Sequence, residues 1–118
     1  MKVDIAADRR LYARVRLSDP VHARSMIDAE RDWRLLSLDV SDGGMQLLSS
    51  EPIAVGARLL CELEADPGSE PIRVVGRIAR CEAIDFHARY NLGVEFVEVG
   101  HAERERLRGL IADRAAVD

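Results

Sequence analysis

Short runs of alternating apolar and polar residues, each ended by a cluster of turn-forming residues, constrain the fold of this chain more than any other feature. Between residues 57 and 64, Leu59, Cys61 and Leu63 share one face of an extended chain, as in a half-buried strand. Asp, Ser, Gly and Pro gather at 19–20, 41–44, 52–56 and 66–69 and interrupt the runs. The pattern predicts an all-β fold.

Strands are expected over residues 33–40, 45–48, 57–64, 72–81 and 90–97. Asp42-Gly43 predicts a hairpin turn between the first two of these strands, and Gly76 predicts a bulge where a barrel strand bends. Residues 21–32 alternate less cleanly, so the strand register there stays open. Roughly six strands are too few for two large sheets and predict a small antiparallel β-barrel or a highly curved sheet.

The period of the apolar residues changes after the last strand. Leu107 and Leu110 recur with helical spacing between residues 101 and 115, which predicts one amphipathic C-terminal helix packed on the barrel. Three arginines, Arg104, Arg106 and Arg108, are expected on a solvated face, with pairs such as Glu103 with Arg106. The alternative is that this face contacts an effector protein.

Length and cysteine usage limit the class of protein. The 118 residues fit a single domain, 1–118, that can hold a core without disulfides. No apolar run reaches the roughly 18 residues of a membrane span, and the first ten residues lack the apolar stretch of a signal peptide, so a cytoplasmic protein without membrane insertion is expected. Cys61 and Cys81 form no CxxC motif and are predicted to be reduced core thiols.

Net charge and scattered histidines exclude several functions. A formal net charge of −4 argues against indiscriminate binding to DNA or RNA, which depends on many contacts between cations and phosphates. His22, His87 and His101 lack metal-ligand spacing, and Ser41 has no GxSxG setting. We therefore expect no metal, no cofactor and no catalysis.

An arginine cluster near the N-terminus is the first candidate binding motif. The stretch DRRLYARVR, residues 8–16, has four arginines against one aspartate, a charge of +3, so the rest of the chain carries −7. The arginines are Arg9, Arg10, Arg14 and Arg16. They are either solvated residues at the entry to a strand or a clamp, because a guanidinium pairs bidentately with phosphate oxygens or with guanine O6 and N7.

The second candidate motif lies at the predicted hairpin turn. Asp39 and Ser41 are two residues apart, a spacing that points both side chains to one face of a strand. The carboxylate could accept hydrogen bonds from guanine N1 and N2, the hydroxyl could make another, and Gly44 would let the backbone approach closely or adopt a positive φ. The alternative is ordinary turn chemistry, in which Asp and Ser bond neighbouring backbone groups.

Taken together, the two motifs resemble those of a known protein family. Arg10-Leu-Tyr-Ala-Arg14 followed by Asp39-Val-Ser41-Asp-Gly-Gly44 resembles the RxxxR and DxSxxG motifs of the PilZ domain family, over nearly the whole chain. The resemblance implies a six-stranded barrel that binds the bacterial second messenger cyclic di-GMP. Arg10 and Arg14 would take guanine edges and phosphates, with Arg9 as an auxiliary contact. Asp39 and Ser41 would hold a guanine, and Gly44 would shape the turn.

The resemblance also implies how such a protein signals. A flexible arm, residues 1–16, would order over the barrel when cyclic di-GMP binds, and an unidentified effector protein would respond, in control of motility, biofilm attachment or exopolysaccharide. The chain would be a monomer or a ligand-dependent dimer. The alternative is a PilZ-like interaction domain that binds no nucleotide; such domains typically lack the arginine motif that this chain retains.

Overall fold

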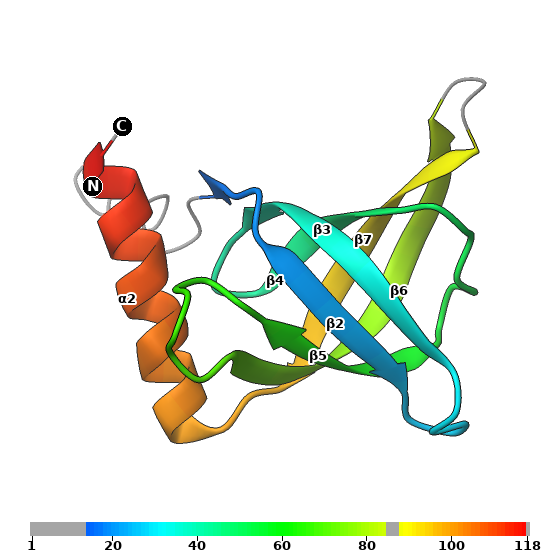
Figure 1. Cartoon of the computed structure of the whole chain (residues 1–118), viewed down its shortest axis with the longest axis horizontal. Coiled ribbons are helices and arrows are strands. Elements are labelled where there is room, and N and C mark those ends of the chain that lie inside the picture. The colour runs from blue at the N-terminus through cyan, green and yellow to red at the C-terminus, as the bar shows by residue number, and fades with distance from the viewer. Residues whose placement is uncertain (1–13, 85–87, 118) are drawn as a thin grey trace, which may run out of the picture.

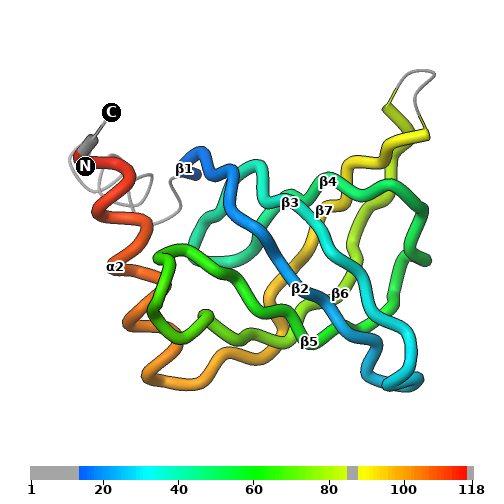
Figure 2. Tube along the Cα trace, in the orientation of Figure 1, coloured from blue at the N-terminus to red at the C-terminus, as the bar shows by residue number. Residues whose placement is uncertain are grey.

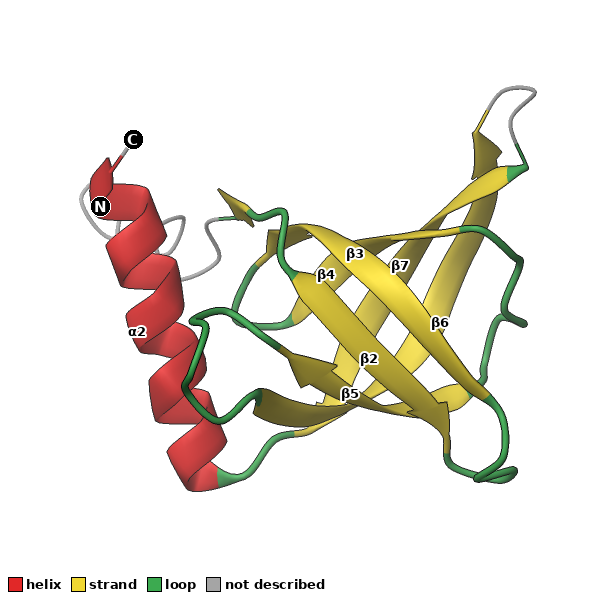
Figure 3. Cartoon of the chain, in the orientation of Figure 1, coloured by secondary structure: helices red, strands yellow, loops and turns green. Residues whose placement is uncertain are grey.

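The structure is a computed structural model, and it describes residues 14–84 and 88–117. Over these ranges the chain forms seven strands followed by one helix (Figure 1, Figure 3). The strands are β1 (Val15–Arg16), β2 (Pro20–Ser25), β3 (Asp32–Val40), β4 (Gly44–Ser49), β5 (Arg58–Leu63), β6 (Ile72–Ile84) and β7 (Arg89–Glu98), and the helix is α2 (His101–Val117).

Neighbouring strands pair antiparallel and close into a barrel. The strand order is β1-β3-β2-β5-β6-β7-β4, and an additional pairing of β3 with β4 joins the ends of the sheet. Strands β2 to β7 make the closed barrel, and β1 is a short extra strand on the end of β3. The predicted six-stranded antiparallel barrel is confirmed.

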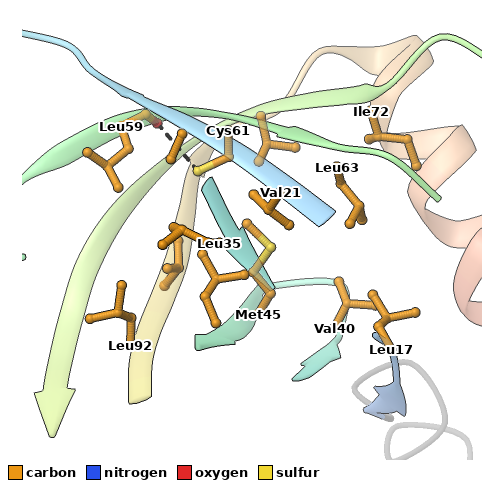
Figure 4. Close-up of a cluster of buried hydrophobic side chains, with 14 of the residues drawn as sticks. Leu17, Val21, Leu35, Val40, Met45, Leu59, Cys61, Leu63, Ile72 and Leu92 are labelled. Carbon is orange, nitrogen blue, oxygen red and sulfur yellow. Dashed lines mark hydrogen bonds between the residues drawn. The ribbon is translucent and has the colours of Figure 1, made fainter. Parts of the chain in front are cut away.

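Alternating apolar side chains fill the barrel interior (Figure 4). Met45, Leu47 and Leu59 are at most 1% exposed. Cys61 is a buried free thiol whose Sγ lies 3.9 Å from the Leu59 carbonyl oxygen, as predicted for a core residue. Cys81 is also free but only half-buried, so the prediction of two core thiols is correct for Cys61 and wrong for Cys81, which packs at the edge of the core.

The segment with the unclear pattern is a hairpin. Val21 and Ala23 point into the core from β2, which pairs with β3 on one side and β5 on the other. The hydrogen bond from Ser25 N to the Arg31 carbonyl oxygen, 2.9 Å, closes the hairpin, and Ile27 at its tip is 97% exposed. The alternation fails in the sequence because the second half of this segment is a turn and not a strand.

The pairing of β6 with β7 contains two irregularities. The first register shift lies between Val75, opposite Glu98, and Gly76, opposite Phe96, so an irregularity occurs at Gly76 as predicted, but the extra residue is Val97 of β7. A Cβ on Gly76 would lie 2.5 Å from Val94 Cγ1, so the bend brings the two strands close together at this glycine. The second shift, between Ile78 and Arg80, was not predicted and reorients the residues that follow it.

The C-terminal helix packs across one end of the barrel (Figure 2). Leu107 and Leu110 are buried as predicted, and α2 extends two residues beyond the predicted end at 115. Within the described residues, no helix has the length and apolar character that a membrane span requires.

The prediction of a solvated face is correct for Arg108, whose side chain is 59% exposed, but wrong for Arg104 and Arg106, which are half-buried and, with Arg114, anchor α2 to barrel loops. Arg104 Nη1 donates to the Asp42 carbonyl oxygen at 2.6 Å, and Arg106 Nη1 donates to the Pro71 carbonyl oxygen at 3.2 Å. Arg114 Nη2 reaches Asp19 Oδ2 at 3.1 Å. Arg106 Nη1 also lies 3.9 Å from Glu103 Oε1, so the predicted pair forms, but it is secondary to these anchors.

Candidate functional site

The structure brings together two predicted site residues that lie 25 positions apart. Arg14 immediately precedes β1, and Asp39 is the penultimate residue of β3. Because β1 pairs antiparallel with the end of β3, with Arg16 opposite Asp39, the end of the arginine motif lies beside the carboxylate. Arg14 Nη1 donates to Asp39 Oδ1 at 2.5 Å.

Of the other three arginines of the cluster, only Arg16 lies within the described residues. Arg9 and Arg10 lie outside the described residues, as does most of the predicted arm. Val15 and Arg16, which we had placed in a flexible arm over 1–16, instead form β1. The predicted bound at residue 16 is therefore too late by these two residues, and Arg14 lies next to the barrel.

Ser41 lies in the turn between β3 and β4 and is 7% exposed. Its backbone N donates to the Gly44 carbonyl oxygen at 2.8 Å, and its hydroxyl donates to the same oxygen at 3.3 Å. These are the contacts expected from turn chemistry, which stabilises the hairpin beside Asp39. A direct contact between Ser41 and a ligand stays a prediction.

Gly44 is required by a close approach between backbones. A Cβ at this position would lie 2.3 Å from the Val94 carbonyl oxygen on β7, whereas a Cβ on Gly43 would meet nothing within 4 Å. Neither glycine has a positive φ. Of the two reasons predicted for Gly44, close approach is therefore the correct one.

A row of paired residues crosses the outer face of the barrel from Asp39. Asp39 on β3 is opposite Gln46 on β4, Gln46 is opposite Gly93 on β7, and Gly93 is opposite Arg80 on β6. Gln46 Nε2 donates to Asp39 Oδ2 at 2.9 Å, and Arg80 Nη2 donates to Gln46 Oε1 at 3.4 Å. Both carboxylate oxygens of Asp39 thus accept a hydrogen bond, one from Arg14 and one from Gln46.

Sequence reasoning missed Gln46 and Arg80. Gln46 was detectable, because it is the polar residue between Met45 and Leu47 and so points outward beside Asp39. Arg80 was not, because its orientation depends on the unpredicted second bulge of β6.

A shallow pocket of about 240 Å³ opens along this row. Arg14 lies at one end and Arg80 at the other, with Gln46 and Gly93 between them and Gly44 on the rim. Because Gly93 has no side chain, the Arg80 guanidinium can lie over its backbone. Two guanidinium groups line the pocket, and the Asp39 carboxylate lies beside it, bound to the lining residues Arg14 and Gln46. This combination suits a ligand that carries both anionic groups and hydrogen-bond donors.

The turn at this site is also tied to the C-terminal helix. Arg104 Nη1 and Arg108 Nε lie 3.1 Å and 3.2 Å from Asp42 Oδ1. Partial burial raises the pKa of the Asp42 carboxyl, but the hydrogen bonds from Arg108 and Arg104 outweigh burial and hold that pKa below its ordinary value. Asp42, in the turn between β3 and β4, therefore links the candidate site to α2.

The family model of the PilZ domain matches residues 8–113. Comparison with curated proteins finds no match. The match to the family model includes both motifs of the resemblance and extends into α2.

Solved structures share the fold. Bacillus subtilis inhibitor of motility (MotI/DgrA) has a TM-score of 0.76 at 18% identity, over 93% of this chain and 53% of that chain. The PilZ domain of YcgR from Escherichia coli, solved with c-di-GMP, has a TM-score of 0.71 at 18% identity, over 92% and 93%. The K. pneumonia MrkH–c-di-GMP complex has a TM-score of 0.71 at 16% identity, over 90% and 52%. The chain spans about half the length of the MotI and MrkH structures.

Proposed function

Because the chain belongs to the PilZ domain family, we propose that it is a receptor for cyclic di-GMP, which binds where Arg14 and Asp39 meet. The observation that carries this proposal is the convergence of these two residues, from separate motifs, beside the outer-face pocket that Arg14 lines. Solved PilZ structures of YcgR and MrkH contain c-di-GMP, which supports the same ligand class for this chain.

Each polar group of the site has a role in this proposal. Asp39 would accept hydrogen bonds from N1 and N2 of a guanine, since its two oxygens already accept two converging donors, Arg14 and Gln46. A guanine that takes these oxygens displaces both donors, and the freed Arg14 can then pair with a phosphate or with guanine O6 and N7. Arg10, with Arg9 beside it, would supply further cations from the arm.

The turn would hold Asp39 in position. Gly44 lets β4 approach β7, and the Ser41 hydroxyl stabilises the hairpin by donating to the Gly44 carbonyl oxygen. The Asp39 carboxylate would thereby be held on the outer face of the barrel. We expect binding without catalysis and without a metal or other cofactor.

Signalling would proceed through an effector protein that contacts the barrel, the ordered arm or α2. The ion pairs of Asp42 with Arg104 and Arg108 give the site a direct connection to the helix. Control of motility, attachment or exopolysaccharide, and a monomer or a ligand-dependent dimer, are parts of the same proposal. MrkH is described as a c-di-GMP-dependent transcription regulatory factor, so the absence of DNA binding in this chain rests only on its net charge of −4.

Isothermal titration of the purified chain with cyclic di-GMP tests the proposal. Arg14→Ala and Asp39→Ala should each weaken binding by roughly tenfold to a hundredfold, the loss expected for a bidentate contact to guanine. Arg73→Ala is the matched control, because Arg73 is also an exposed arginine in an ion pair, with Glu62 at 2.6 Å, but lies outside the pocket.

The outcomes separate the two candidate functions. Saturable binding that GTP does not reproduce, and that Arg10→Ala/Arg14→Ala loses, would support a receptor. A folded wild-type chain that does not bind cyclic di-GMP would refute it and favour a PilZ-like interaction domain that binds no nucleotide.

A further inference from the structure

Arg80 reaches the outer face of the barrel only because of a bulge in β6. Ile78 is opposite Val94, and both side chains are buried. In a regular ladder Arg80 would then be opposite Leu92, which is fully buried, and would point into the core. The register shift instead places Arg80 opposite Gly93, on the face that carries the pocket. An extra residue in this strand thus turns a guanidinium toward the site.

Two neighbouring side chains hold the guanidinium of Arg80 in place by contacts with its nitrogens. Arg80 Nε lies 2.8 Å from Glu82 Oε1, and Arg80 Nη2 donates to Gln46 Oε1 at 3.4 Å. The group lies over the backbone of Gly93, since a Cβ built on that glycine would be 3.3 Å from both Cζ and Nη2 of Arg80. The Arg80 side chain nevertheless stays 49% exposed.

These contacts leave the outer planar face of the group and its Nη1 for a ligand. Two nitrogens of the guanidinium are engaged at its edge by Glu82 and Gln46, and one side of it rests on Gly93. We infer that Arg80 is a specificity-determining residue of the site, and that the free face of its guanidinium stacks on a guanine base of the bound cyclic di-GMP. The inference rests on the proposed function and extends it to β6.

Stacking is favoured over a phosphate contact by the arrangement of the donors. A phosphate pairs bidentately with two guanidinium N–H groups at one edge, and the edge formed by Nε and Nη2 is already used by Glu82 and Gln46. A purine base stacks on the planar face of an arginine, which is the surface that remains accessible here. Lysine carries the same charge but has no planar face, so the two roles respond differently to Arg80→Lys.

The test is titration of cyclic di-GMP into the wild-type chain and into Arg80→Lys, Arg80→Ala and Gly93→Ala. Arg80→Lys and Arg80→Ala should weaken binding by a similar factor, roughly threefold to thirtyfold. Gly93→Ala should also weaken binding, because its Cβ lifts the guanidinium away from the barrel while every ligand-binding side chain is retained. Arg73→Lys is the control for the loss of an exposed arginine, and melting temperatures verify that each variant is folded.

The results decide between the possible roles of Arg80. If Arg80→Lys binds within about twofold of the wild type, the stacking role is overturned, whether or not Arg80→Ala is weakened. If Gly93→Ala does not fold, the comparison of lysine with alanine at Arg80 still decides. If the wild-type chain binds no cyclic di-GMP, the proposed function fails first and the inference falls with it; if the wild type binds and all Arg80 variants match it, only the inference fails.

Discussion

Replacing Gly44 with alanine tests whether the turn beside Asp39 depends on close packing of β4 against β7. The added Cβ would lie 2.3 Å from the Val94 carbonyl oxygen, which belongs to the backbone and cannot rotate away. The two strands must therefore separate by about 1 Å at this point to reach an ordinary C···O distance. That movement strains the hydrogen bonds from Ser41 N to the Gly44 oxygen and from Phe96 N to the Gly43 oxygen.

The size of the effect follows from these contacts. Overpacking a tight site costs about 1–3 kcal/mol, and a strained backbone hydrogen bond adds about 1 kcal/mol. We expect Gly44→Ala to lower the free energy of unfolding by about 2–4 kcal/mol. For a chain of 118 residues, each kcal/mol corresponds to about 4 °C, so Tm should fall by about 8–16 °C.

Gly43→Ala is the matched control for this prediction. It adds the same methyl group one residue earlier, where nothing lies within 4 Å and φ is not positive. Its effect should stay within about 0.5 kcal/mol, or roughly 2 °C. Thermal unfolding followed by circular dichroism measures both variants, and equal melting temperatures for the two would refute the packing argument.

Three further predictions concern the helix anchor and the thiols. Asp42→Asn should loosen α2, because Arg104 and Arg108 lose their shared carboxylate, and faster amide exchange in the helix would reveal it; unchanged exchange would contradict it. Because the pKa of Asp42 is lowered in the folded chain, its negative charge stabilises the fold fully at pH values above its ordinary pKa of 3.8. This stabilisation is lost as the pH falls through the lowered pKa, so the stabilities of wild type and Asp42→Asn should converge only under acid conditions. Burial raises the pKa of the Cys61 thiol to about 12, so iodoacetamide should alkylate the half-buried Cys81 in the native protein and Cys61 only after unfolding; equal rates would disprove this.

Most of the barrel was predictable because its signals are local. Alternation placed a strand at 45–48 where β4 runs from Gly44 to Ser49, and helical spacing placed a helix at 101–115 where α2 runs from His101 to Val117. The register over 21–32 could not be predicted, because only residues 21–25 of this segment belong to β2 and most of the remainder is a turn, which breaks the period-two pattern.

The candidate site was only partly predictable, since its geometry depends on pairings between distant strands. The motifs identified Asp39 and Gly44, but not that Gln46 and Arg80 complete the row. One inserted residue in β6 decides whether Arg80 points inward or outward, and no local pattern reports it. The anchors of α2 were missed because the partners of Arg104 and Arg114 are loops far away in the sequence.

The most direct test of the central claim is the ¹⁵N–¹H correlation spectrum of the chain during titration with cyclic di-GMP. The account predicts that the largest shift changes fall on the amides of Asp39, Gln46 and Gly93, which form the row across the pocket. Val21 and Leu63, which pair β2 with β5 outside the pocket, should change little. Saturating ligand that leaves the row unmoved, or changes centred on β2 and β5, would contradict the assignment of the site.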